Sequence, residues 1–225
     1  MANSKPRGML LVRAINNYGK DAPASLYPDA MNEILPGLFL GSWDAARDTD
    51  ALRAAGITHV LTLMRELALY KLDNLAAPDC PFTTLHLPII DGAAFKLLPY
   101  VPRCIEFIDA ALSGGGKVLV HCFQGVSRSA SVVAAYLMAK RGLARDEALE
   151  LVRAARPAIQ PNLGFMKQLD EFYKANYVVV IAPVAVSTTA DVNADVDVVE
   201  YVPPAGTGRV KALAAAYRQS TAAHP

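Results

Sequence analysis

The residues best suited to do chemistry lie in one short stretch, HCFQGVSRS, at residues 121–129. It follows the apolar run 117–120 and precedes a helical pattern. A loop from a strand into a helix N-terminus points successive backbone N–H groups at one spot, where the helix dipole adds positive potential. Gly125 lets the backbone turn, and Arg128 can grip phosphate oxygens through two hydrogen bonds. The stretch therefore predicts a site for a dianion such as phosphate.

Cys122 is the candidate nucleophile of this stretch. A free thiol has a pKa near ~8.5, whereas a thiol at a helix N-terminus beside a cation can fall to roughly 3.5–7.5. We therefore expect a thiolate at neutral pH, ready to attack. His121 is not placed like the base of a cysteine protease, because neighbouring side chains on a strand point to opposite faces. We expect His121 to orient the loop through hydrogen bonds instead.

The elements around this stretch alternate between strand and helix patterns. We expect strands at residues 33–35, 38–40, 57–63, 82–88 and 117–120, and helices at 44–55, 97–112, 128–141, 146–155 and 163–175. The strands at 57–63 and 82–88 are expected to be buried in a sheet that is covered on both faces. The helix at 128–141 is apolar nearly all round, which is typical of a central buried helix. Cys104 keeps helical spacing with core residues and is expected in the core. Strands alternating with helices indicate an α/β fold.

The chain divides into three parts by composition. Residues 1–30 lack sustained periodicity and are expected to form an irregular N-terminal arm. The organised domain is expected at 31–175. Residues 176–225 begin with an acidic, valine-rich linker, followed by a possible short helix at 209–219. A calcium-loop interpretation of residues 191–202 fails, because valines occupy the positions of the turn glycine and the bidentate glutamate.

The overall charge and the cysteines limit the partners and the compartment. Lys and Arg total 22 against 21 for Asp and Glu, so no global field favours nucleic acid or anionic lipid. No apolar run is long enough to span a bilayer. The three cysteines show no zinc or redox spacing, which is typical of a reducing compartment. We expect a cytoplasmic location, extending to the nucleus, while the oligomeric state stays open.

The stretch HCFQGVSRSA resembles the HCxxGxxRS signature of the dual-specificity branch of the cysteine-dependent protein-tyrosine-phosphatase superfamily. The resemblance extends through EILPGLFLGSWDAA, GITHVLTL, LHLPIID, AAYLMAKRG and ARPAIQPNLGFMKQLDEF, from about Met31 to Tyr173. It implies a central, mostly parallel sheet of about five strands with helices on both faces. It also makes residues 31–175 a phosphatase catalytic domain.

The resemblance assigns roles to the residues of the loop. Cys122 would attack phosphorus and form a cysteinyl-phosphate, and Ser129 would hydrogen-bond the sulfur and help it leave in the hydrolysis step. Arg128 and the loop amides would stabilise charge on the phosphate oxygens. The phosphate-binding residues implied in this way are Phe123, Gln124, Gly125, Val126, Ser127 and Arg128. Neither a metal nor another cofactor is implied.

The general acid implied by the resemblance is Asp91, in LPIIDGAAF, upstream of the cysteine. Asp73 and Asp79 are weaker candidates, because neither directly follows a buried strand running toward the catalytic face. Asn162, in the PNLGF stretch, is expected to brace the acid loop or the catalytic loop. It directly precedes a helix, so acting only as its N-cap is the alternative.

The expected function is hydrolysis of phosphotyrosine and of phosphoserine or phosphothreonine in proteins. The loop lacks the lysines that phosphoinositide phosphatases carry, although a non-protein substrate stays open. A module that only binds phosphorylated partners, a rhodanese-like sulfur carrier and an arsenate reductase are further alternatives. For Cys80, an ordinary loop cysteine and a protective disulfide with Cys122 are both conceivable.

Overall fold

The computed structural model describes residues 30–65 and 72–179. Helices and strands run from Met31 to Lys174. The expected N-terminal arm, the calcium-like stretch and the short helix at 209–219 lie outside the described residues, as does nearly all of the expected linker. None of the helices in the described ranges is long and apolar enough to cross a membrane.

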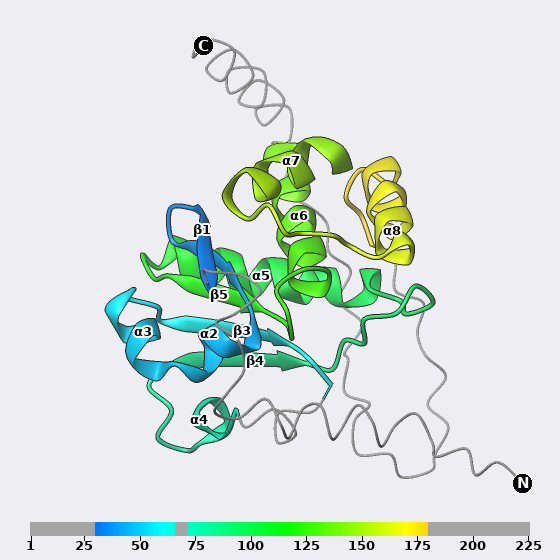
Figure 1. The fold of residues 1–225 in the computed structure, drawn as a ribbon. Coiled ribbons are helices and arrows are strands. Elements are labelled where there is room, and N and C mark those ends of the chain that lie inside the picture. The colour runs from blue at the N-terminus through cyan, green and yellow to red at the C-terminus, as the bar shows by residue number, and fades with distance from the viewer. Residues whose placement is uncertain (1–29, 66–71, 180–225) are drawn as a thin grey trace, which may run out of the picture. The chain divides into compact units, whose positions relative to one another are not determined.

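A five-stranded sheet organises the domain (Figure 1). Its strands, in spatial order, are β1 (Met31–Leu35), β2 (Leu38–Gly41), β5 (Val118–His121), β3 (His59–Leu63) and β4 (Thr83–Leu87). Only β1 and β2 pair antiparallel, through a tight turn at Gly37, whose φ is +83°. The other pairs are parallel. The expectation of a mostly parallel sheet is confirmed.

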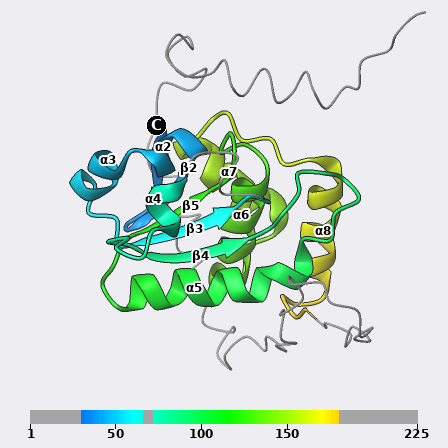
Figure 2. The same ribbon diagram turned by 90° about the horizontal axis from the view of Figure 1, so that it is seen from below.

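Helices cover both faces of this sheet, as the fold class predicted. They are α2 (Trp43–Arg47), α3 (Thr49–Ala54), α4 (Asp73–Ala76), α5 (Val101–Ser113), α6 (Arg128–Arg141), α7 (Arg145–Ala155) and α8 (Leu163–Lys174), with a 3-10 turn, η2 (Leu98–Tyr100), before α5. Figures 1 and 2 show α2–α4 on one side of the sheet and α6–α8 on the other. Alternation along β5 explains how both faces are covered: Val118 and Val120 join the core beneath α5 and α6, while Leu119 is buried toward the opposite face.

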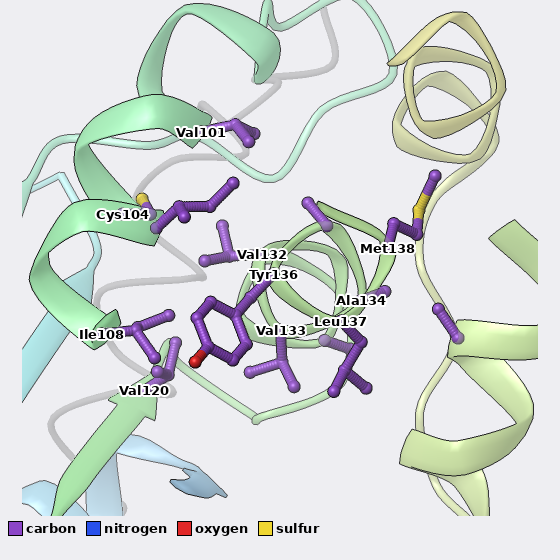
Figure 3. Close-up of a cluster of buried hydrophobic side chains, with 14 of the residues drawn as sticks. Val101, Cys104, Ile108, Val120, Val132, Val133, Ala134, Tyr136, Leu137 and Met138 are labelled. Carbon is purple, nitrogen blue, oxygen red and sulfur yellow. The ribbon is translucent and has the colours of Figure 1, made fainter. Parts of the chain in front are cut away.

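Helix α6 lies at the centre of the hydrophobic core (Figure 3). Its residues from Ser129 to Ala139 are all buried, which explains the apolar character seen all round in the sequence. Gly142 ends the helix in the left-handed conformation, with φ +64°. Cys104 of α5 lies fully buried in the same core, as expected. The loop that precedes α6 is therefore attached to the most deeply buried helix of the domain.

Two expected elements are wrong in detail. The single helix expected at 44–55 is two short helices, because the side chain of Asp48 accepts a hydrogen bond from the Ala51 N–H and starts α3 afresh. The strand at 82–88 was expected to be buried on both faces. Strand β4 lies at the edge of the sheet with one neighbour, and Thr83, Thr84 and His86 are exposed.

Candidate active site

The catalytic loop, residues 122–127, connects the carboxyl end of β5 to the first residue of α6. Strands β3, β4 and β5 are parallel, so their carboxyl ends meet at one edge of the sheet. Asp91 follows β4 by a few residues and reaches the same edge. The topology thus brings Asp91 to Cys122 across β3.

Cys122 is almost completely buried, with 1% of its surface exposed. Its Sγ lies 3.2 Å from the Ser129 hydroxyl oxygen. Burial alone raises the pKa of the thiol. The positive charge of Arg128, the Ser129 hydroxyl and the backbone N–H groups of Ser129 and Gly125 outweigh it, so the pKa of Cys122 is lowered. The loop therefore stabilises the thiolate form of Cys122 relative to a free cysteine.

Two features curl the loop so that its N–H groups turn inward. Gly125 has φ +69°, and a Cβ there would lie only 2.6 Å from the Gly41 carbonyl oxygen. On the outside, the buried Arg156 donates from Nε to the Gly125 carbonyl at 2.9 Å and from Nη2 to the Gln124 carbonyl at 3.3 Å. Because these carbonyls point at Arg156, the neighbouring N–H groups are free to face an anion.

Sequence reasoning missed Arg156. Two of its partners are backbone carbonyls of a loop 31 and 32 positions earlier, which leave no mark on the sequence around it. The usable signal was its place in ARPAIQPNLGF, a stretch already noted for its resemblance. A buried arginine is expensive unless its donors are satisfied, and Arg156 satisfies them largely on the loop it shapes.

Arg128 has one group of donors committed and another available. Nη1 donates to the Leu63 carbonyl at 3.2 Å and to the Ile89 carbonyl at 3.3 Å, which fixes the guanidinium between the ends of β3 and the acid loop. Nε is buried without a hydrogen-bond partner among the described residues. A phosphate oxygen held in the loop would accept a hydrogen bond from this buried and otherwise unsatisfied N–H group.

Asp91 is held by two hydrogen bonds on one oxygen. Oδ1 accepts from the Ser127 hydroxyl and from the Asn162 side-chain amide, each at 2.8 Å. Oδ2 lies 3.6 Å from Nε of Arg128. Oδ1 is therefore occupied by two donors, while Oδ2 faces the Arg128 guanidinium. Ser127, expected to bind phosphate, thus also connects the loop to the acid.

Asn162 performs both of the functions that the sequence left open. Its Oδ1 accepts from the Phe165 N–H at 2.9 Å and caps α8. Its Nδ2 is the donor to Asp91. Its backbone N–H also donates to the Ser127 hydroxyl oxygen at 3.2 Å. The N-cap alternative is therefore true but incomplete.

His121 lies on the sheet face opposite to α6, since it pairs with Thr62 and shares the phase of Leu119. Its Nε2 lies 2.8 Å from the Thr62 hydroxyl oxygen, and both side chains are buried. Burial, assisted by the Arg128 charge, lowers the pKa of His121 to about 3. The ring is neutral at pH 7, in agreement with a structural rather than a base function.

The side chains converge on a cavity of about 220 Å³. It is lined by Asp91, Cys122, Gln124, Val126, Ser127, Arg128, Gln160 and Asn162. Two expected phosphate-binding residues, Phe123 and Gly125, are not among the lining residues. Phe123 stacks on Trp43 with ring centroids 6.0 Å apart. Gly125 acts through its backbone, as described above.

The remaining candidates lie elsewhere. Asp79 and Cys80 precede β4 at its amino end, whereas Cys122 follows the carboxyl end of β5. Asp73 begins α4, also between β3 and β4. All three cysteines are free thiols, so the structure contains no Cys80–Cys122 disulfide. Within residues 30–65 and 72–179, no group of three or more metal-ligating side chains gathers.

A buried thiol with a lowered pKa, an arginine Nε without a hydrogen-bond partner among the described residues and a carboxyl group meet around one small cavity, which is an arrangement suited to bind an anion. Residues 38–175 match the family model described as the dual specificity phosphatase catalytic domain. The chain is 42% identical over 147 residues to dual specificity protein phosphatase 1B of Arabidopsis thaliana, covering 64% of this chain and 83% of that protein. Dual specificity protein phosphatase 1 of the same plant is 40% identical over 165 residues, covering 73% and 76%.

Solved structures agree with these relatives. The crystal structure of human DUSP28 superposes with a TM-score of 0.60 at 36% identity, covering 68% of this chain and 98% of that one. The chain therefore belongs to the dual specificity phosphatase family, and it is a protein phosphatase.

Proposed function

We propose that this phosphatase hydrolyses phosphotyrosine and phosphoserine or phosphothreonine in proteins through a cysteinyl-phosphate on Cys122. The observation that carries the proposal is the meeting of three groups around one cavity: a thiol with a lowered pKa, the Arg128 guanidinium, whose Nε has no hydrogen-bond partner among the described residues, and the carboxyl group of Asp91. These are the nucleophile, the charge stabiliser and the proton donor that transfer of a phosphoryl group needs.

In the first step Cys122 Sγ attacks phosphorus, the S–P bond forms and the bond to the leaving oxygen breaks. Asp91 gives its proton to that oxygen. The loop N–H groups and Arg128 bind the three remaining phosphate oxygens, over which charge is spread. In the second step Asp91 takes a proton from water, the water oxygen attacks phosphorus, and the S–P bond breaks. Ser129, within hydrogen-bond distance of Sγ, stabilises the departing thiolate.

The catalytic domain proposed here is residues 31–179, four residues longer than the expected 31–175. Helices and strands from Met31 to Lys174, the family match at 38–175 and the burial of Tyr177 and Val179 in the core support these bounds. The free state of all three cysteines supports a reducing compartment, so we propose a cytoplasmic or nuclear location. Tyr177 and Val179 are buried in the core of this unit, and the Tyr177 hydroxyl donates to the Leu143 carbonyl at 3.3 Å, so the expected linker start at 176 is wrong. Only the residues beyond 179 are proposed to be a tail.

The substrate is proposed to be a monophosphorylated protein side chain. Among the described residues that line the cavity, Arg128 is the single cation, and the other lining groups include the neutral amides of Gln124 and Gln160. A second phosphate on the substrate would find no partner there. Ile90 is 45% exposed and Leu163 is 85% exposed, and each adjoins a lining residue in the sequence. A peptide around the phosphorylated residue could cover these side chains.

A panel of phosphopeptides tests the substrate class. The Cys122→Ser protein serves as the trap and the unaltered enzyme is assayed for turnover. We expect capture and hydrolysis of phosphotyrosine, phosphoserine and phosphothreonine peptides, and weaker binding of inositol polyphosphates. Tighter binding and faster hydrolysis of the polyphosphates would assign a non-protein substrate. Binding without turnover by the unaltered enzyme would indicate a phospho-binding module.

Asp91→Asn tests the acid. The amide keeps the size of the side chain but supplies no proton, so we expect kcat to fall ~10²–10⁴-fold for phenyl phosphate. The loss should be smallest for aryl phosphates with the most acidic leaving groups, and one limb of the pH–rate profile should flatten. Asp79→Asn, at the other end of β4, is the matched control. An unchanged profile in Asp91→Asn would assign the acid to another group.

A further inference from the structure

The segment that carries Asp91, residues 91–98, is here called the acid segment. It has little regular structure of its own before η2, and its internal backbone bonds include that from the Phe95 N–H to the Gly92 carbonyl at 3.0 Å. Figures 1 and 2 both show the chain between β4 and α5 passing beside the first turns of α8. The contacts with α8 therefore matter for where Asp91 lies.

Gln168 of α8 is bonded almost entirely to this segment. Its Oε1 accepts from the Leu97 N–H at 2.7 Å and from the Leu98 N–H at 3.3 Å. Its Nε2 donates to the Phe95 carbonyl at 2.8 Å and, within α8, to the Gly164 carbonyl at 3.2 Å. The side chain is 9% exposed, so water competes weakly for these bonds. Both lone pairs and both protons of the amide are used.

Gly164 lies one helical turn before Gln168, on the same face of α8. A Cβ at Gly164 would overlap the Ala93 carbonyl and lie 2.6 Å from the Ala93 Cα. The neighbour in the way is backbone, which cannot rotate aside as a flexible side chain could. The absence of a side chain at Gly164 is thus what lets the acid segment pack directly on the helix.

We propose that Gly164 and Gln168 are positioning residues for the general acid. With Asn162, they attach the acid segment to α8 at three places and set the position of the Asp91 carboxyl group over the cavity. Proton transfer requires a donor within hydrogen-bond reach of the leaving oxygen, and a misplacement of about 1 Å can cost ~10²-fold in rate. This proposal rests on the proposed function, in which Asp91 is the acid. Neither Gly164 nor Gln168 lines the cavity, so each acts through Asp91.

Two variants test the proposal with a series of aryl phosphates. Gly164→Ala displaces the acid segment, and Gln168→Met keeps a similar volume while removing all four hydrogen bonds. We expect each to lower kcat by ~10–10²-fold for poor leaving groups and only slightly for the most acidic ones, with KM little changed. In an Asp91→Asn background each should add little further loss, because the group that they position no longer donates a proton.

Leu169→Ala is the matched control. Leu169 adjoins Gln168 in α8 but packs in the hydrophobic core, so its truncation should lower Tm without altering the dependence on leaving group. If Gly164→Ala does not fold, Gln168→Met carries the test alone.

Two outcomes would overturn the proposal, and they differ. Losses equal across the leaving groups, or additive with Asp91→Asn, would show that α8 does not act through the acid. If Asp91→Asn itself lacks leaving-group dependence, the assignment of the acid fails first and the positioning function fails with it.

Discussion

Cys104 and Cys122 are buried to the same extent, with 0% and 1% of their surfaces exposed, and belong to one hydrophobic core. Burial raises the pKa of both thiols. For Cys104 the charge of Arg103 opposes this effect only weakly, and the pKa is raised far above the ordinary value. For Cys122 the charge of Arg128 and hydrogen bonds from Ser129 and Gly125 outweigh it, and the pKa is lowered. Burial alone therefore produces an inert thiol.

The difference originates in the backbone around each sulfur. Cys104 lies within α5, where N–H groups are used by carbonyls one turn back, and its neighbours in Figure 3 are the apolar side chains of Val101 and Val132. Cys122 lies where a strand has ended and α6 has not begun, so the N–H groups there have no helical partners. The N–H groups beside Cys122 can therefore hydrogen-bond the thiolate, whereas the N–H groups around Cys104 are already bonded within the helix.

Replacing Cys122 by serine and Cys104 by alanine should show the largest contrast between the two cysteines. Cys122→Ser should lose turnover of phenyl phosphate by more than ~10⁴-fold, because a hydroxyl is not ionised near neutral pH. Cys104→Ala should keep kcat and KM and lose about 1 kcal/mol of unfolding free energy from poorer packing. Steady-state kinetics and urea unfolding measure the two effects. Retained turnover in Cys122→Ser would end the proposed chemistry.

Ser129→Ala should make the thiol of Cys122 more similar in pKa to that of Cys104. Removal of the hydroxyl at 3.2 Å from Sγ takes away a donor to the thiolate, so the pKa of Cys122 should rise. Alkylation by iodoacetamide, followed by mass spectrometry of each cysteine, should then begin at higher pH, and kcat should fall ~10-fold as the sulfur leaves less readily. Ser131→Ala is the control, since that hydroxyl donates to the Ser127 carbonyl. An identical alkylation profile in both variants would contradict the role of Ser129.

His121→Gln should have the smallest effect of these substitutions, and the effect should be on the pH dependence of stability. The pKa of His121 is about 3 in the fold against an ordinary value of 6.5, so the neutral ring stabilises the fold fully above about pH 6.5. That contribution is lost as pH falls from 6.5 toward 3. The variant should therefore show a flatter decline of unfolding free energy across this window. His59→Gln is the control, and equal slopes in all three proteins would contradict the prediction.

The loop and the helix that follows it were predictable from sequence because their signals are local. The helix expected at 128–141 has the bounds of α6, since Gly142 marks its end within the chain itself. The family resemblance pointed to Asp91, and the structure brings its carboxyl group to the cavity beside Cys122. The edge position of β4 was not predictable in the same way, because an edge depends on strand order rather than on composition.

The supports of the site were harder to foresee. Arg156 and Gln168 bond backbone atoms of distant segments, and a backbone partner leaves no distinctive residue type in the sequence. Gly164 belongs to a stretch noted for its family resemblance. The sequence does not show that a side chain at this position would overlap the backbone of Ala93. Asp48 did carry a local signal. Aspartate is a preferred N-cap residue, so it can mark the start of a new helix within a stretch that looks continuously helical.

The hydrogen bond from Arg156 Nη1 to the Asn32 side-chain oxygen, at 2.6 Å, bears on where a catalytic fragment can begin. Asn32 lies in β1, ahead of the family match that starts at residue 38. A polypeptide trimmed to that match would lose the edge strand and leave one donor of a buried guanidinium without this partner. The smallest fragment suited to crystallisation or inhibitor screening should therefore begin no later than residue 31 and extend to residue 179, because Tyr177 and Val179 are buried in the core.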